Sequence, residues 1–224
     1  MYSISFDAIS PYLTGLPRAM LTSLLLSVSA GLLSAAFGIL GALGRRSRWR
    51  FLRVVLTAYV EVMRNIPLLI ILYVVYFTLP QLNIRMSGYY SALIALTVNG
   101  TAYMIEIFRS GLVAVPRGQF EATQAQGMTA FQSFRFVIFP QIIRTVYSPL
   151  GNLFIAIVTG SSLASVVSVT DLTGWMGTSG AASFRYFELF LVAGIAYVLI
   201  CQAINLTRLA VGRKLFNEMK MERS

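Results

Sequence analysis

The sequence predicts an all-α integral membrane protein with five transmembrane helices in a single domain, residues 1–224. Two observations carry this prediction. The 224-residue chain is 57% hydrophobic and only 12% charged, with a mean hydropathy of +0.73, whereas soluble domains usually carry about twice that share of charged residues. Its apolar residues also fall into five long runs, and no Pro-, Ser- or Gly-rich linker divides the chain.

Several other classes of function are excluded by the composition. The net charge of +10 suggests nucleic acid, but the basic residues lie between apolar runs, so we predict contact with membrane lipid and no nucleic acid. Cys201 is the only cysteine, and the absence of His excludes a His triad or a His-based metal site. The first apolar run has no cationic segment before it and is long for a signal peptide, so we expect it to be retained.

The first span is expected over residues 19–43, after a polar-to-amphipathic leader. This length crosses a hydrocarbon core of about 30 Å at about 1.5 Å per residue. Small residues recur there every four positions, a spacing that lets helices pack closely in lipid. They form two series, Gly31/Ala35 and Ser34/Gly38/Ala42.

The second span, residues 54–79, follows a strongly basic connection at 44–53 and contains Glu61, Arg64, Asn65 and Pro67. Charges at that depth cost about 2.5–3.5 kcal/mol each, so they should face protein or a water-filled cavity. Glu61 and Arg64 lie three apart on one helical face, where they can neutralise each other or contact a substrate. Pro67 cannot donate to the Met63 carbonyl, which predicts a bend.

The third span, residues 89–108, carries a polar stripe. Asn99, Tyr103 and Glu106 recur at intervals of four and three, with Thr101 nearby. Such a stripe points to a pathway or to hydrogen bonding between helices, and the spacing does not separate the two.

The remaining spans are expected at residues 142–158 and 186–206. Between them lies a polar run containing Ser161 and Ser162, followed by a segment from Asp171 to Gly180 that we expect to be irregular. A basic, amphipathic tail from Arg208 to Ser224 is typical of a membrane-surface end.

A short polar helix is predicted over residues 117–128, between the third and fourth spans. Gly118 punctuates its entry, Glu121 lies in its first turn, where negative charge suits the helix dipole, and Gly127 supplies its stop. Ala122 and Ala125 give it a smooth face that another protein can approach. An ordinary loop is the alternative.

Lys and Arg residues predict the sidedness. The connection at 44–53 has five, residues 109–144 have four and the tail has five, whereas the opposite side holds only Arg18, Arg85 and Arg185. The amino terminus is therefore expected outside and the carboxyl terminus in the cytoplasm.

Several motifs together resemble the permease subunits of bacterial ABC importers for polar amino acids, of the histidine, glutamine, arginine and opine type. Glu121-Ala122 with Gly127 and the ending Ile138-Phe139-Pro140-Gln141 resemble the EAA signature. The matches extend over nearly the whole chain, through residues 59–69, 99–109, 115–119, 151–152, 161–165 and 171–172. The third EAA position is Thr123 rather than Ala.

The resemblance implies a type I importer fold and two sets of site residues. The segment 117–128 would be the coupling helix, seated on a cytoplasmic ATPase through Gly118, Glu121, Ala122, Thr123, Ala125 and Gly127. Polar residues in the membrane would line the substrate pathway: Glu61, Arg64, Asn65, Asn99, Thr101, Tyr103, Glu106, Ser161 and Ser162. Arg64 would meet the carboxylate of an amino acid, and Glu61 or Glu106 its ammonium group.

The same resemblance implies the partners. They are two ATPase subunits, a second permease subunit that is identical or related, a periplasmic binding protein and the amino acid itself. The chain has no GxxxxGK[ST] phosphate loop, so ATP and Mg²⁺ are expected on the ATPase and no cofactor on this chain. The family often has Lys followed by Asp or Asn where Thr159 and Gly160 stand here, which argues against an exclusively basic substrate.

Two other classes of function remain open. A standalone secondary carrier needs no ATPase, but five spans without a detectable inverted repeat fit it poorly. A non-transporting scaffold leaves the charges within the membrane unexplained.

Overall fold

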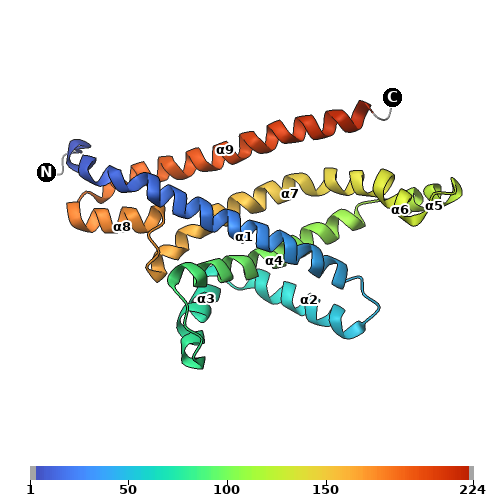
Figure 1. The fold of residues 1–224 in the computed structure, drawn as a ribbon, viewed down its shortest axis with the longest axis horizontal. Coiled ribbons are helices and arrows are strands. Elements are labelled where there is room, and N and C mark those ends of the chain that lie inside the picture. The colour runs from blue at the N-terminus through green and yellow to red at the C-terminus, as the bar shows by residue number, and fades with distance from the viewer. Residues whose placement is uncertain (1–3, 222–224) are drawn as a thin grey trace.

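The computed structural model describes residues 4–221, with residues 217–221 described by their backbone alone. Long helices run along one axis of the molecule, and the short helices α5 and α6 project at one end (Figure 1). In chain order the elements are η1 (Asp7–Gly15), α1 (Leu16–Gly44), α2 (Arg50–Asn65), α3 (Leu68–Tyr73), η2 (Val74–Thr78), η3 (Leu79–Leu82), α4 (Gly88–Val113), α5 (Arg117–Ala125), α6 (Ala130–Gln132), η4 (Ser133–Ile138), α7 (Phe139–Gly160), η5 (Ser161–Val167), α8 (Leu172–Ser183) and α9 (Tyr186–Met221).

Four of these helical stretches are long and apolar enough to cross a membrane, and a bent pair supplies a fifth. The pair joins Arg50–Asn65 to Leu68–Leu82 at an angle of 107°. Its break falls at Pro67, as the sequence predicts, because proline has no N–H to continue the hydrogen-bond ladder. The four unbroken stretches are Asp7–Gly44, Gly88–Val113, Ala130–Val167 and Tyr186–Phe216.

The segment from Asp171 to Gly180 is helical, so the expectation of irregular structure there is wrong. Helix α8 begins after Asp171, whose Oδ1 accepts a hydrogen bond from the Gly174 backbone N–H at 2.9 Å. The Tyr197 hydroxyl on α9 donates to Oδ2 of the same carboxylate at 3.1 Å. Burial of this side chain raises the pKa of the Asp171 carboxyl above its usual range, an effect that these hydrogen bonds partly offset.

The two ends of the chain also differ from the sequence expectation. The leader contains the 3₁₀ helix η1, which runs directly into α1, and Pro17 stands in the first turn of α1, where its missing N–H costs nothing. At the other end, α9 continues the fifth span to Met221, so the described part of the amphipathic tail is helical. The last basic residue of that tail, Arg223, lies outside the described residues.

Small residues bring α1 and α4 into close contact, which confirms their predicted packing role. Gly38 lies so near Met104 that a Cβ at position 38 would meet the Met104 Cβ, and Gly100 faces the Ser34 side chain in the same way. The Ser34 hydroxyl then donates to the Thr97 carbonyl at 3.2 Å. Close backbone approach with polar contacts is how helices associate in lipid.

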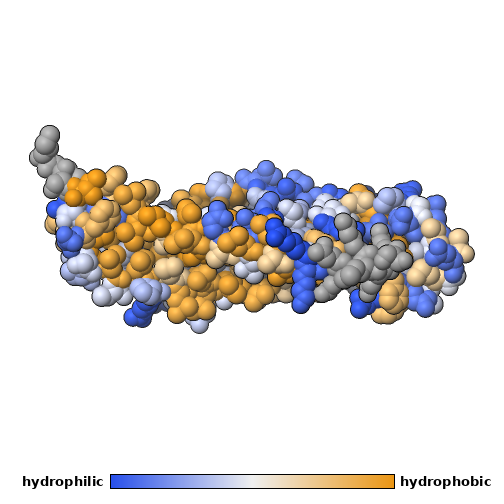
Figure 2. Space-filling view, turned by 90° about the horizontal axis from the view of Figure 1, so that it is seen from above, coloured by the Kyte–Doolittle hydropathy of each residue, from blue (hydrophilic) through white to orange (hydrophobic). Residues whose placement is uncertain are grey.

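The outer surface is apolar over most of its length and polar at one end. Figure 2 shows the hydrophobic side chains gathered over one part of the face, with hydrophilic residues concentrated toward the other. Large apolar side chains such as Leu32, Leu40 and Phe190 are at least 64% exposed. This is the surface of a protein whose solvent is a bilayer.

Candidate functional site

Helix α5 projects from one end of the molecule (Figure 1). Pro116 in an extended conformation starts it, and Gly127, with a φ of 72°, ends the turn that follows. Glycine adopts a positive φ without the steric cost that a Cβ would add, which explains why the helical segment stops at Gly127, as predicted. The side chains of Glu121, Ala122 and Ala125 are exposed, and nothing lies within 4 Å of where a Cβ on Gly118 would stand.

Thr123 lies on the opposite side of α5, facing the protein. Its side chain is only 3% exposed. The hydroxyl donates to the Phe120 carbonyl at 2.8 Å and lies 2.6 Å from the Ser133 hydroxyl at the start of η4. Thr123 therefore anchors α5 to η4, whereas the exposed face of α5 is formed by its neighbours. Its burial differs from the prediction that Thr123 is one of the residues that contact the ATPase.

A hydrogen-bonded cap, not predicted from the sequence, fixes the segment between α5 and η4. The Thr129 hydroxyl accepts a hydrogen bond from the Gln132 backbone N–H at 3.3 Å, and the Gln132 side-chain oxygen accepts from the Thr129 N–H at 2.9 Å. This reciprocal pair of hydrogen bonds is a capping box, and the sequence pattern Thr-x-x-Gln is typical of one. It fixes the start of α6, and Ser133 comes directly after the end of α6.

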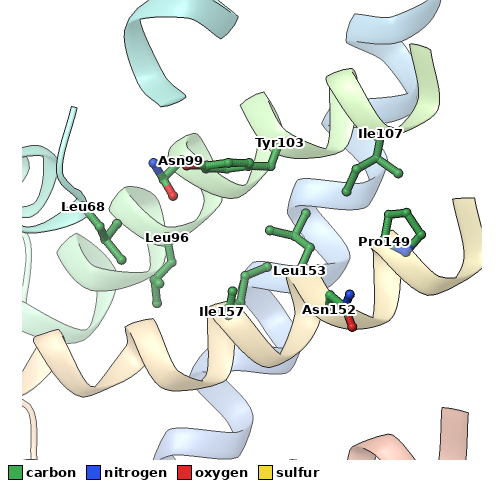
Figure 3. A pocket seen from close by; sticks show the side chains of 10 residues that line it. Leu68, Leu96, Asn99, Tyr103, Ile107, Pro149, Asn152, Leu153 and Ile157 are labelled. Atoms are coloured by element: carbon green, nitrogen blue, oxygen red, sulfur yellow. The ribbon is translucent and has the colours of Figure 1, made fainter. Parts of the chain in front are cut away.

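A cavity of about 430 Å³ lies between α4 and α7, close to the beginning of α3. Figure 3 shows Asn99 and Tyr103 on α4 and Asn152 on α7, among apolar side chains that include Leu68 and Leu153. A mostly apolar cavity with a few polar groups is the usual form of a small-molecule site. Asn152 matched a family position in the sequence but was not among the predicted pathway residues.

The polar stripe on α4 meets the broken end of α2. The Asn99 side-chain amide donates to the Met63 carbonyl at 2.9 Å. In an unbroken helix residue 67 would donate to this carbonyl, but Pro67 has no N–H. The Tyr103 hydroxyl donates to the Arg64 carbonyl at 3.4 Å, and the Arg64 guanidinium lies 5.4 Å from the centre of the Tyr103 ring. Asn99 and Tyr103 thus donate hydrogen bonds to the carbonyls that the break at Pro67 leaves without a helical partner.

Glu61 and Arg64 do not pair, which corrects the ion pair that their spacing suggests. Among residues 4–216, whose side chains the structure describes, the salt bridges are Arg45–Glu106, Arg109–Glu106 and Arg185–Glu188. The side chains of Glu61, Arg64 and Asn65 are all exposed, and the Asn65 amide donates to the Glu61 backbone carbonyl at 2.7 Å.

Glu106, the third stripe residue, is engaged with two arginines. Its carboxylate accepts from Arg45, after the end of α1, at 2.9 Å, and it also contacts Arg109 one turn along α4. A carboxylate held by two guanidinium groups is not free to receive a substrate ammonium group. Its role is to tie the connection between α1 and α2 to α4.

Three other predicted pathway residues lie away from this cavity. Thr101 is 7% exposed and lines a separate groove between α1, α2 and α4. Ser161 is fully buried, and its hydroxyl donates to the Val158 carbonyl at 2.7 Å. Ser162 donates to the Thr159 carbonyl at 2.7 Å. The structure brings together Asn99, Tyr103 and the end of α2, and leaves these three outside the group.

A multi-pass helical protein with a mostly apolar cavity that holds a few polar groups between two of its helices, and with a short exposed helix at one end, has the form of a membrane transport subunit. The model of the family "Binding-protein-dependent transport system inner membrane component" matches residues 34–217. The chain belongs to this family, the permease subunits of ABC importers, which are multi-pass proteins of the inner membrane. The family resemblance found in the sequence is confirmed.

Individual relatives cover most of the chain. The probable glutamine ABC transporter permease protein GlnM of Bacillus subtilis (strain 168) is 33% identical over 88% of this chain and 90% of its own length. The octopine transport system permease protein OccM of Rhizobium radiobacter is 36% identical over 84% of this chain and 79% of its own. A crystal structure of an amino acid ABC transporter with histidines matches with a TM-score of 0.89 and 29% identity, covering 95% of this chain and 100% of that one.

Proposed function

We propose that this chain is the permease subunit of an ATP-driven importer that moves a polar amino acid or an opine into the cytoplasm. The observation that carries the substrate class is the cavity between α4 and α7, where the amides of Asn99 and Asn152 and the ring of Tyr103 are the polar groups. The relatives named for glutamine and octopine transport, and the solved amino acid transporter, support the same class.

The residues around the break in the second span supply the charges that an amino acid needs. A zwitterion requires a donor for its carboxylate and an acceptor for its ammonium group. The Arg64 guanidinium is exposed beside Tyr103, at the rim of the polar stripe, and the Glu61 carboxylate is exposed one turn earlier on α2. Because neither is consumed by an ion pair within the described residues, both are available. Glu106 does not share this role, since it is held by Arg45 and Arg109.

We do not expect the substrate to be exclusively a basic amino acid, because the end of α7 has no carboxylate at residues 159 and 160. The Thr159 hydroxyl donates to the carbonyls of its own helix, at 3.2 Å to Ile155 and 3.1 Å to Ala156, and Gly160 follows it. No carboxylate stands at these two positions to pair with a second positive charge. Arginine uptake that neutral and acidic amino acids fail to inhibit would contradict this part of the proposal.

Coupling to ATP is assigned to α5. We infer that its exposed face, with Glu121, Ala122 and Ala125, seats on a cytoplasmic ATPase subunit that binds ATP and Mg²⁺. A second permease chain and two ATPase subunits complete the assembly, and a binding protein delivers the substrate. The 107° break at Pro67 is where the second span would adjust as the pathway alternates between the two sides of the membrane.

The distribution of charge supports an outside amino terminus. The connection between α1 and α2, the helices α5 and α6, and the end of α9 all lie toward one end of the molecule, and the amino terminus lies at the other (Figure 1). Those segments carry most of the Lys and Arg residues, which favours a cytoplasmic location for that end.

The experiment that tests the coupling role is capture of the ATPase. The tagged chain is purified in mild detergent from its own host as wild type, as Glu121→Arg and as Thr145→Arg, which adds a positive charge at an exposed position on α7. We expect an ATPase with a phosphate loop to co-purify with the wild type and with Thr145→Arg, but not with Glu121→Arg. A folded wild-type chain that brings down no ATPase would favour the standalone carrier instead.

A further inference from the structure

The connection between α1 and α2, residues 44–53, presents positive charge that nothing in the described chain neutralises. Arg45 turns inward to Glu106 at 2.9 Å. The other four arginines are exposed, and their side chains make no hydrogen bond or ion pair with the side chains described for residues 4–216: Arg46, Arg48, Arg50 and Arg53. A cluster of this density next to a membrane helix attracts anions.

Two exposed aromatic rings lie within the same connection. Trp49 is 76% exposed and Phe51 is 81% exposed. Aromatic and basic residues together are typical of the level at which lipid headgroups meet the hydrocarbon. In Figure 1 the connection lies short of α5 and α6 along the long axis, nearer to the membrane spans than the end of the molecule assigned to the ATPase.

An apolar groove of about 450 Å³ begins beside this cluster. Its walls are α1 and α2 and its floor is α4. Gly44 and Leu52, which line it, are the immediate sequence neighbours of Arg45 and Arg53. The side chains of Phe37 and Leu40 extend the groove along α1, and both are more than 50% exposed.

Thr97 and Thr101 lie under the floor of the groove. Their hydroxyl oxygens are buried, and the two residues are only 8% and 7% exposed. Because these oxygens are covered, the groove presents an almost wholly apolar surface, which suits a lipid acyl chain.

We propose that the groove and the basic connection together bind one anionic glycerophospholipid. An acyl chain fills the groove, and the phosphate and its anionic headgroup lie among the four exposed arginines of the connection. The negative charge selects this class of lipid over a zwitterionic one. The site goes beyond the proposed transport function, because it concerns a constituent of the membrane and holds whichever solute is carried.

Native mass spectrometry of the full-length chain in its purified assembly tests this site. The assembly is titrated with equal amounts of phosphatidylglycerol and phosphatidylcholine that carry the same acyl chains. The variant Arg48→Gln/Arg50→Gln/Arg53→Gln removes three charges beside the groove. The matched control Arg135→Gln/Arg144→Gln/Arg213→Gln removes three exposed charges on η4, α7 and α9. A third variant, Leu40→Trp, fills the groove from an exposed position and leaves the arginines intact.

We expect the wild type and the control triple variant to retain phosphatidylglycerol in preference to phosphatidylcholine. The triple variant in the connection should bind it roughly a hundredfold more weakly, at about 1 kcal/mol, or fivefold, for each arginine. Leu40→Trp should also lose the tightly held lipid.

Three results would overturn the proposal. The first is equal retention of the two lipids by the wild type, and the second is the same loss in both triple variants, which would mean attraction by net charge alone. The third is unchanged binding by Leu40→Trp. A groove that holds no lipid in the assembly because a second copy of the chain covers it would give the first result. Gel filtration and thermal unfolding confirm that each variant is folded.

Discussion

Asn99 is expected to stabilise the break in the second span, and its removal should be measurable. In Asn99→Ala the Met63 carbonyl loses the amide that donates to it at 2.9 Å, and Pro67 offers no replacement. Hydrogen bonds between membrane helices average about 0.6 kcal/mol and reach about 1.7 kcal/mol. Because this carbonyl would be left without its partner, we expect a value near the upper limit, about 1.5 kcal/mol.

A double-mutant cycle with Pro67→Ala isolates this effect. Alanine at position 67 restores an N–H that can donate to the Met63 carbonyl, so the penalty of Asn99→Ala should fall by about 1 kcal/mol in that background. The free energy of unfolding is measured by SDS titration in mixed micelles, with helix content followed by circular dichroism. Asn152→Ala is the matched control, since Asn152 is exposed in the same cavity and makes no side-chain hydrogen bond in the described structure.

The same penalty for Asn99→Ala in both backgrounds, within the usual additivity error of about 0.5 kcal/mol, would refute the reasoning. It would mean that the amide acts elsewhere and that the proline break is not completed by α4.

Three further predictions concern packing, anchoring and titration. Gly38→Leu should lower the free energy of unfolding by about 3 kcal/mol because its Cβ would meet Met104, whereas Gly194→Leu, in open space on α9, should change it little; equal effects in the two variants would contradict the α1–α4 contact. Thr123→Val removes the 2.6 Å contact with the Ser133 hydroxyl, which should cost about 1 kcal/mol and speed backbone hydrogen exchange in α5, whereas Thr123→Ser should leave exchange unchanged. Unchanged exchange in Thr123→Val would rule out the anchoring role. Burial raises the pKa of Asp171, so the folded chain binds this proton more tightly than the unfolded chain, and the free energy of unfolding should fall as pH rises from the usual Asp range through the raised pKa. In Asp171→Asn, which keeps the helix cap, the free energy of unfolding should depend less on pH. The same slope against pH in the two proteins would contradict this.

Hydropathy and proline placement were enough to predict the spans and the bend. An apolar run of twenty residues has few alternatives in a membrane, and Pro67 removes one hydrogen bond wherever the helix lies. Close packing at Gly38 was also predictable from its spacing, because small residues every four positions have one main use in lipid.

The partners of the polar residues were not predictable, because they depend on which helices meet. Spacing placed Asn99, Tyr103 and Glu106 on one face, but it could not show that Arg45 reaches Glu106 from another element or that Asn99 reaches Met63. Helix α8 was missed because Gly174, Gly177 and Gly180 lower its intrinsic helix propensity. The buried side chain of Trp175 and the Asp171 cap stabilise it in the fold.

The central claim is that an amino acid crosses the membrane through this chain when an ATPase acts on α5. Its most direct test is uptake of a radiolabelled amino acid mixture by proteoliposomes that contain the purified assembly and its binding protein, with ATP inside. We expect uptake that requires ATP, that is lost in Glu121→Arg and that survives in Thr145→Arg. Uptake driven by an ion gradient without ATP, and equal in both variants, would contradict the claim.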